Sequence, residues 1–164
     1  SKGYGLAIGS VDRIKEMQAD LIVTVDTGSL SHKEVDHANS LGIDVIITDH
    51  HNVADQHPKA IAVINPKRKD HSYPYRDFAG VGVAFKLVQA LMTELTGLDN
   101  GQEKWLLDFV ALGTVCDIVP LSGENRMLVS YGLKVLKVSK REGIKALIAS
   151  SGIDLSNINT LDIP

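Results

Sequence analysis

Two short runs of β-branched residues, each ending in a carboxylate, constrain the fold of this sequence more than any other feature. The first run covers residues 21–25 and leads into Asp26. The second covers residues 45–48 and leads into the triplet Asp49, His50, His51. Consecutive β-branched residues are typical of strands covered on both faces, as in a parallel sheet. We therefore expect two buried parallel strands whose carboxyl ends open onto a polar site, because ligands bind at that edge of such sheets.

The residues around these runs indicate helices and a third strand. A helix is expected over residues 10–17, beginning at a capping serine. A second helix over residues 31–42 is favoured by Ser31 and Glu34, which have the spacing of a capping box. Residues 60–64 form a third candidate strand. Strand and helix alternating in short succession predict right-handed crossovers and a parallel sheet.

The second half of the sequence has a helical pattern. Four helices are expected after residue 79, ending near Thr96, Leu112, Lys137 and Ala149. The fold class that we expect is therefore α/β, with a parallel sheet flanked by helices over residues 1–78 and a mainly helical part over residues 79–164.

Composition limits the classes of function. The 164 residues are 44% hydrophobic, which suits one globular domain. The formal net charge is −3 and aromatic residues make up 5%, so the sequence lacks the overall basic character of many nucleic-acid binders. Any contact with phosphates must be local or made through a metal ion. Because Cys116 is the one cysteine and no apolar run is long enough to span a membrane, we expect a cytoplasmic protein without a membrane partner.

The side chains at the two strand ends have the chemistry of a metal site. Neighbouring parallel strands lie about 4.8 Å apart, so Asp26 and His50 could reach one ion if their strands are adjacent. Carboxylate and imidazole together suit manganese, zinc or iron. Adjacent residues on an extended chain point in opposite directions, so we expect one of His50 and His51 to face the metal and the other the substrate or a supporting position. The alternative is a polar loop with two solvated histidines.

Asp117 is a third candidate metal ligand. It stands in the otherwise apolar run 113–119, where an ionised carboxylate is costly unless it is paired or bound to a metal. The preceding Cys116 could act as a nucleophile or a soft ligand, but a small buried hydrophobe is the favoured interpretation.

Two further segments are candidate substrate contacts. Lys67, Arg68 and Lys69 follow the third strand and would lie at the same edge of the sheet, where they could contact phosphates, although most such triplets belong to solvated loops. Gly80 and Gly82 precede a predicted helix and could bring backbone amides towards an anion. Close packing of that helix on the sheet is the alternative explanation for these glycines.

Taken in order, these segments resemble the DHH phosphoesterase superfamily, which is named for the run that Asp49, His50 and His51 match. The resemblance is greatest to its branch of single-stranded-DNA-specific 5′→3′ exonucleases. An ordered set of segments is more specific than the Asp-His-His triplet alone. The matching segments are residues 3–6, 24–26, 48–51, 64–66, 79–86, 111–121, 124–126 and 132–133.

The resemblance implies a site for two metal ions, usually Mn²⁺ and alternatively Mg²⁺. Asp26 would bridge the metals, and His50 and Asp117 would be further ligands. His51 would approach the scissile phosphate, and Asp49 would orient a histidine. The implied activity is hydrolysis of phosphodiester bonds in single-stranded DNA during repair and recombination.

One expected segment does not occur in the sequence. The superfamily's first motif, a strand ending in Asp-x-Asp-Gly, should precede residue 3. We therefore expect residues 1–164 to be the central part of a single DHH catalytic domain, weak or inactive alone, within a longer protein. Two alternatives stay open. One is a phosphoesterase acting on short oligonucleotides, cyclic dinucleotides or pyrophosphate, and the other is an inactive domain that binds nucleic acid or protein.

Overall fold

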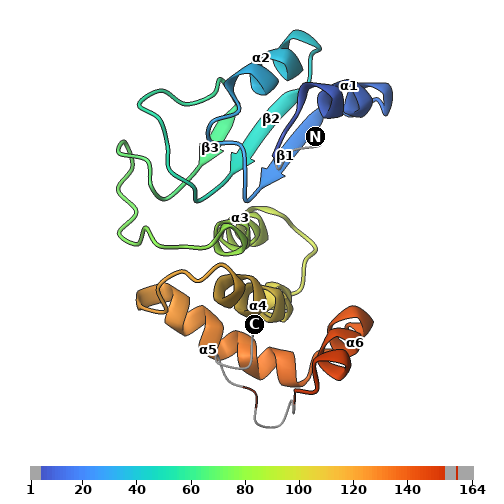
Figure 1. The fold of residues 1–164 in the computed structure, drawn as a ribbon, viewed down its shortest axis with the longest axis vertical. Coiled ribbons are helices and arrows are strands. Elements are labelled where there is room, and N and C mark those ends of the chain that lie inside the picture. The colour runs from blue at the N-terminus through green and yellow to red at the C-terminus, as the bar shows by residue number, and fades with distance from the viewer. Residues whose placement is uncertain (1–4, 154–157, 159–164) are drawn as a thin grey trace. The chain divides into compact units, whose positions relative to one another are not determined.

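The computed structural model describes residues 5–153 and residue 158, so positions 3 and 4 of the family resemblance lie outside the described part. The chain divides into two compact units, Ser1–Ala84 and Phe85–Pro164 (Figure 1). In the described part of the chain, none of the helices combines the length and the apolar character needed to cross a bilayer.

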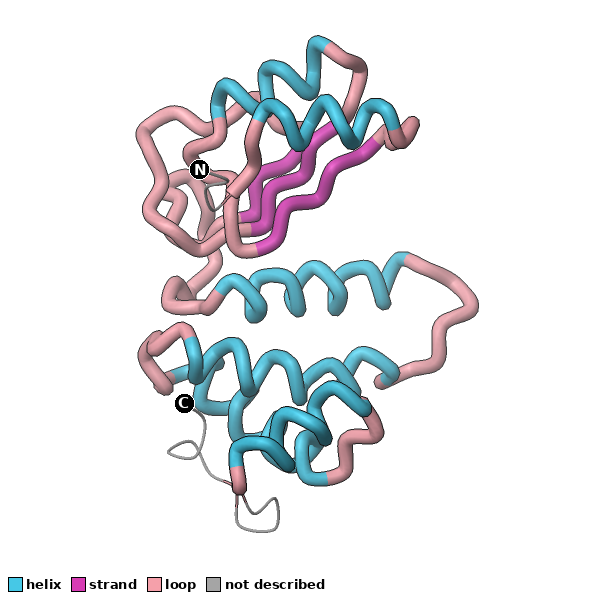
Figure 2. The backbone as a smooth tube through the Cα atoms, turned by 45° about the vertical axis from the view of Figure 1, so that its right-hand side comes forward, coloured by secondary structure: helices cyan, strands magenta, loops and turns pink. Residues whose placement is uncertain are grey.

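The first unit contains a parallel sheet with helices on one face. Its strands are β1 (Leu21–Val25), β2 (Asp44–Thr48) and β3 (Ala62–Ile64), hydrogen-bonded in that order and all parallel. Helices α1 (Ile8–Glu16) and α2 (His32–Ser40) lie on the same face of this sheet (Figures 1 and 2). The predicted α/β class, with a parallel sheet and short crossovers, is confirmed.

The core of this unit forms between the sheet and these two helices. It consists of buried aliphatic side chains from both layers: Val11, Ile22, Val35, Ala38, Ile43, Val45 and Ile47. The expected burial of both strand faces is wrong for β1, where Ile22 is buried but Leu21, Val23 and Val25 are 47%, 45% and 52% exposed. The reason is that α1 and α2 cover one face of the sheet, and a strand needs cover on both faces to be buried throughout.

Local signals located the helices better than they located the helix ends. The serine expected to cap the first helix, Ser10, lies inside α1, and Ala7 occupies the N-cap. Ser31 does occupy the N-cap of α2, but its side chain makes no capping hydrogen bond. The third strand begins later than expected, at Ala62, although the Ile61 amide already donates to the Val45 carbonyl oxygen at 2.9 Å.

The helical part begins with α3 (Gly80–Glu94), which runs across the boundary between the units. It continues with a short 3₁₀ helix η1 (Gln102–Leu106), α4 (Leu107–Cys116), α5 (Gly123–Lys137) and α6 (Glu142–Ser151). The prediction of a single helix ending near Leu112 is corrected, because η1 and α4 are separate elements and α4 continues to Cys116. Trp105, in η1, is 58% exposed.

Helices α4 and α5 pack closely at a glycine. A side-chain carbon at Gly132 on α5 would lie 2.3 Å from the Leu107 carbonyl oxygen and 2.6 Å from the Ala111 side chain on α4. Any larger residue at this position would force the two helices apart.

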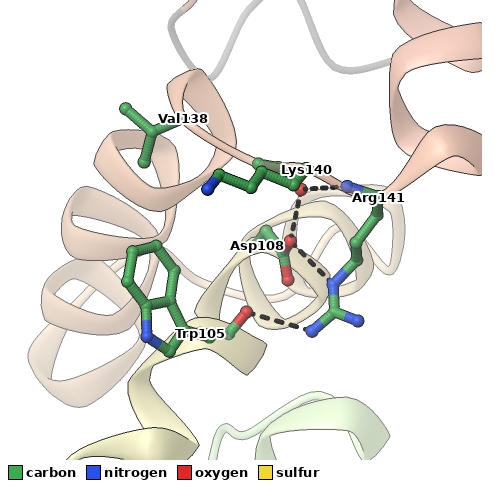
Figure 3. Close-up of a pocket in the computed structure, with 6 residues that line it drawn as sticks. Trp105, Asp108, Val138, Lys140 and Arg141 are labelled. Atoms are coloured by element: carbon green, nitrogen blue, oxygen red, sulfur yellow. Dashed lines mark hydrogen bonds and ion pairs between the residues drawn. The ribbon is translucent and has the colours of Figure 1, made fainter.

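A buried carboxylate joins α4 to the segment before α6 (Figure 3). Asp108 is 1% exposed and accepts hydrogen bonds from the Ser139 hydroxyl at 2.9 Å and from Arg141 Nε at 3.0 Å. Arg141 also donates to the Trp105 carbonyl oxygen at 3.2 Å, and its guanidinium lies over the Phe109 ring. These polar groups line a pocket, and their hydrogen-bonding atoms are paired with one another. We therefore interpret Asp108 and Arg141 as a structural ion pair and not as a binding site.

We expect Arg141→Ala to lower the free energy of unfolding by about 2–3 kcal/mol, because it leaves the Asp108 carboxylate buried without its cation. Urea unfolding followed by circular dichroism measures this loss. Lys145→Ala is the control, because it removes a more exposed ion pair with Glu142 and should change stability by about 0.5 kcal/mol or less. Equal losses in the two variants would contradict a structural role for the buried pair.

Candidate metal centre

Asp26 follows β1 directly and has an unusual backbone conformation. Its φ is +62°, in the left-handed region that few residues other than glycine adopt. Its amide donates to the Thr48 carbonyl oxygen at 2.9 Å, which continues the pairing of β1 with β2 by one residue. The Thr48 hydroxyl donates to the Thr24 carbonyl oxygen at 2.8 Å and ties the two strand ends together. Strained residues of this kind cost about 1–3 kcal/mol and cluster at functional sites.

Asp49 follows β2 and organises the turn that carries both histidines. The side chain accepts hydrogen bonds from the Ser29 amide at 2.9 Å, the His50 amide at 2.8 Å and the His51 amide at 3.2 Å. Its Oδ1 also lies 2.8 Å from Nδ1 of the His51 ring. Burial disfavours the charged carboxylate, but the hydrogen bonds from His51 and Ser29 outweigh it and lower the pKa of Asp49 to about 2. Asp49 is therefore an ionised, buried support for His51.

Ser29 and Asn65 also hold this turn, and neither was predicted from the sequence to be a site residue. Asn65 is buried and donates through Nδ2 to the Ser29 hydroxyl at 2.8 Å and to the His51 carbonyl oxygen at 2.9 Å. Its Oδ1 accepts the Lys67 amide at 2.8 Å. Asn65 thus connects the loops that follow all three strands. The signals in the sequence were its place directly after the third predicted strand and its membership of the family segment 64–66.

The histidines meet Asp26 at the carboxyl edge of the sheet. His50 Nε2 lies 3.0 Å from Asp26 Oδ1, and both atoms are shielded from solvent. Asp26, His50 and His51 each offer a ligand atom, and these atoms all lie within 4.8 Å of one another. The two rings are 4.5 Å apart between centroids, so the expectation that they point to opposite sides is wrong.

This cluster fits a divalent metal ion. A carboxylate oxygen and imidazole nitrogens are donors that suit manganese, zinc or iron. Asp26 and His50 bring such donors together at a depth where water does not reach the facing atoms. The hydrogen bond between His51 and Asp49 is the arrangement by which proteins usually fix a metal-binding or catalytic imidazole.

Asp117 lies in the second unit, at the C-cap of α4. The expectation of apolar surroundings for this carboxylate is wrong, because Asp117 is exposed and the next residue, Ile118, is 90% exposed. Cys116 is exposed as well, so the expectation of a buried cysteine is also wrong. A role for Asp117 as a ligand stays a prediction from the family resemblance.

The basic triplet after β3 is partly engaged in structural contacts. Arg68 binds both oxygens of Asp70 through Nε and Nη2, at 2.9 and 2.6 Å, and donates to the Val63 carbonyl oxygen. This ion pair raises the pKa of Arg68 and lowers the pKa of Asp70 to about 2. Lys69 forms an exposed pair with Asp55. Phosphate contacts by Lys67, Arg68 and Lys69 stay predictions, and the pair with Asp70 makes Arg68 the least available of the three.

Gly80 and Gly82 both lie in the first turn of α3 and not before it. The Gly82 amide donates to the Ala79 carbonyl oxygen at 2.9 Å, so this donor is already used. A side-chain carbon at Gly82 would lie 3.1 Å from the Phe78 ring, which favours close packing as the reason for this glycine. Anion binding by Gly80 and Gly82 stays a prediction.

Comparison with known proteins finds relatives whose names state the same activity. The single-stranded-DNA-specific exonuclease RecJ of Salmonella typhimurium is 46% identical over 170 residues, covering 98% of this chain and 30% of the relative. RecJ of Bacillus subtilis is 44% identical over 158 residues, covering 96% of this chain and 19% of the relative. A crystal structure of exonuclease RecJ bound to manganese matches 99% of this chain and 40% of that chain, with a TM-score of 0.84 and 32% identity.

The chain thus spans less than a third of the length of these two sequence relatives. The family model described as the DHH family, N-terminal domain, matches residues 6–114. This match includes β1, β2 and the cluster of Asp26, His50 and His51. The chain belongs to the DHH family.

Proposed function

We propose that residues 1–164 are the central part of a DHH catalytic domain in a metal-dependent exonuclease. This enzyme degrades single-stranded DNA from the 5′ end in cytoplasmic DNA repair and recombination. The observation that carries the proposal is the convergence of Asp26, His50 and His51, with ligand atoms within 4.8 Å of one another at the carboxyl edge of the parallel sheet. Support comes from RecJ relatives whose names give this specificity and from a similar RecJ structure that binds manganese.

In this proposal Asp26 and His50 hold a Mn²⁺ or Mg²⁺ ion, and Asp117 is the further carboxylate ligand that the family resemblance implies. The complete domain would hold two ions. When bound, such ions polarise the phosphoryl group and lower the pKa of a coordinated water. The strained backbone of Asp26 and its short distance to His50 keep the two ligands in place before an ion arrives.

His51 is proposed to act on the phosphate and not as the main ligand. Its side chain is 51% exposed, whereas that of His50 is 8% exposed, so the His51 ring is the more accessible to a substrate. The bond between Nδ1 and Asp49 Oδ1 fixes the ring, and the role proposed for this exposed imidazole is a hydrogen bond to a phosphate oxygen. Asp49 is proposed as the positioning group for this histidine.

The proposal is tested with a form of the protein that carries its natural flanking residues. Single-stranded DNA labelled at either end, duplex DNA, a cyclic dinucleotide and pyrophosphate are incubated with manganese. The expected result is release of nucleotides from the 5′ end of single-stranded DNA alone. Preference for a small phosphate ester would replace the proposed substrate, and binding without turnover would identify an inactive binding domain.

The 164-residue chain alone is expected to bind manganese weakly and to hydrolyse single-stranded DNA poorly. The family's first motif supplies carboxylates that this chain lacks, and in-line displacement assisted by two metals requires both ions. Calorimetric titration with manganese, beside a nuclease assay on the same sample, measures both properties. Rapid manganese-dependent turnover by this chain would show that its site needs no further ligands.

A further inference from the structure

We infer that Gly80 is a positioning residue of the candidate metal centre, because its missing side chain makes room for the Asp26 carboxylate. A side-chain carbon built at Gly80 would lie 2.2 Å from Asp26 Oδ1, 2.4 Å from its Cγ and 2.5 Å from its Cβ. Real side-chain carbons do not approach other atoms this closely. The inference rests on the proposed function, in which Asp26 is a metal ligand.

Position 80 requires a glycine because a side chain would not fit beside Asp26, and not because the backbone needs a conformation that only glycine adopts easily. The φ of Gly80 lies outside the left-handed region, so an alanine could adopt the same backbone conformation at the first position of α3. The three atoms nearest to a side-chain carbon at this position all belong to Asp26. Replacement of Gly80 therefore acts on Asp26 directly.

The start of α3 is anchored, so it cannot easily retreat from Asp26. Phe78 and Ala79 are 2% and 1% exposed. The Tyr75 ring packs edge-on against Phe78, with 4.8 Å between centroids. The Ala79 carbonyl oxygen accepts the amides of Gly82 and Val83 at 2.9 and 3.1 Å. A side chain at position 80 should therefore displace Asp26 more readily than the helix.

The Asp26 atom that a side chain at position 80 would clash with most severely belongs to the carboxylate proposed to bind the metal ion. Asp26 Oδ1 would lie closest to a side chain at position 80, and it also lies 3.0 Å from His50 Nε2. The contact with Gly80 thus fixes the distance between the two proposed ligands.

The first test compares Gly80→Ala with the parent chain by calorimetric titration with manganese. We expect the affinity to fall about tenfold, within the range seen when the supports of metal ligands are altered. The matched control is Gly9→Ala in the first turn of α1, where a side-chain carbon would meet no atom within 4 Å. The control should bind manganese as the parent does. Parent-like affinity of Gly80→Ala would overturn the inference.

The second test needs no metal. Asp26→Gly removes the three atoms that lie nearest to a side-chain carbon at position 80, and glycine adopts a φ of +62° without strain. Gly80→Ala should lower the thermal midpoint of the parent by several degrees and that of Asp26→Gly by much less. Equal losses in both backgrounds would overturn the inference. If the parent binds no manganese, the proposed function fails, whereas the coupling between positions 26 and 80 still decides whether Gly80 positions Asp26.

Discussion

Asp49→Ala is expected to lower the free energy of unfolding by about 3–5 kcal/mol, because each buried amide left without an acceptor costs about 1–3 kcal/mol. The Ser29, His50 and His51 amides all donate to this carboxylate, and the His51 ring loses its partner as well. Because Asp49 is 1% exposed, water cannot replace the missing oxygens without opening the turn. Urea unfolding followed by circular dichroism, together with hydrogen exchange of the β2 amides, measures the loss.

Two variants distinguish this network from a general effect of losing a carboxylate. Asp44→Ala removes an exposed carboxylate at the other end of β2 and should change stability by about 0.5 kcal/mol or less. Asp49→Asn keeps one acceptor but directs an amide towards groups that are themselves donors, so its loss should be intermediate. If Asp49→Ala were as stable as Asp44→Ala, the hydrogen bonds to Asp49 would not support the turn.

The sequence predicted the sheet and the place of the site because both depend on local patterns. Runs of β-branched residues gave β1 and β2, and their parallel pairing places Val25 opposite Thr48. Since both strands end at the same level, the residues that follow them, Asp26 and Asp49, must emerge side by side. A polar residue directly after each of two neighbouring parallel strands is therefore enough to predict a shared site.

The directions of the histidine side chains could not be predicted from strand geometry. Alternation holds only while the chain is extended, and β2 ends at Thr48. Beyond it the backbone turns around the Asp49 side chain, whose Oδ1 accepts the amides of both following residues. This turn brings the rings of His50 and His51 to the same side. A side chain that accepts hydrogen bonds from its own neighbours thus overrides the local rule.

Features that depend on contacts between distant segments also could not be predicted from the sequence. Gly80, at the start of α3, lies close to Asp26, which follows β1. No hydrophobic periodicity in the sequence indicates this contact. The exposure of Asp117 has a different cause. The apolar residues before it continue α4 to Cys116, so Asp117 occupies the C-cap position at the end of a helix and does not interrupt a buried run. An apolar stretch alone does not reveal where a helix emerges into solvent.

In a form of the protein that carries its natural flanking residues, His50→Ala is expected to reduce manganese affinity by about a hundredfold or more and to lower turnover. Changes in the partners that orient metal ligands cost 10–100-fold in affinity, and loss of a ligand should cost at least as much. His50 is the more buried of the two histidines, and its Nε2 lies 3.0 Å from Asp26 Oδ1. Calorimetric titration with manganese measures the change. His32→Ala at the start of α2 is the control for a lost imidazole and should bind manganese normally.

His51→Ala is expected to leave manganese affinity nearly unchanged and to lower kcat by about a hundredfold or more, in a form of the protein that hydrolyses single-stranded DNA. Loss of an interaction made mainly in the transition state lowers kcat without weakening the binding of a ground-state component. The His51 ring lies with His50 and Asp26 in one cluster, so its position would also allow it to bind the metal ion. The two variants distinguish these two roles. If His51→Ala lost as much manganese affinity as His50→Ala, both rings would be ligands, and Asp49 would support a metal-binding imidazole instead of one that contacts the phosphate.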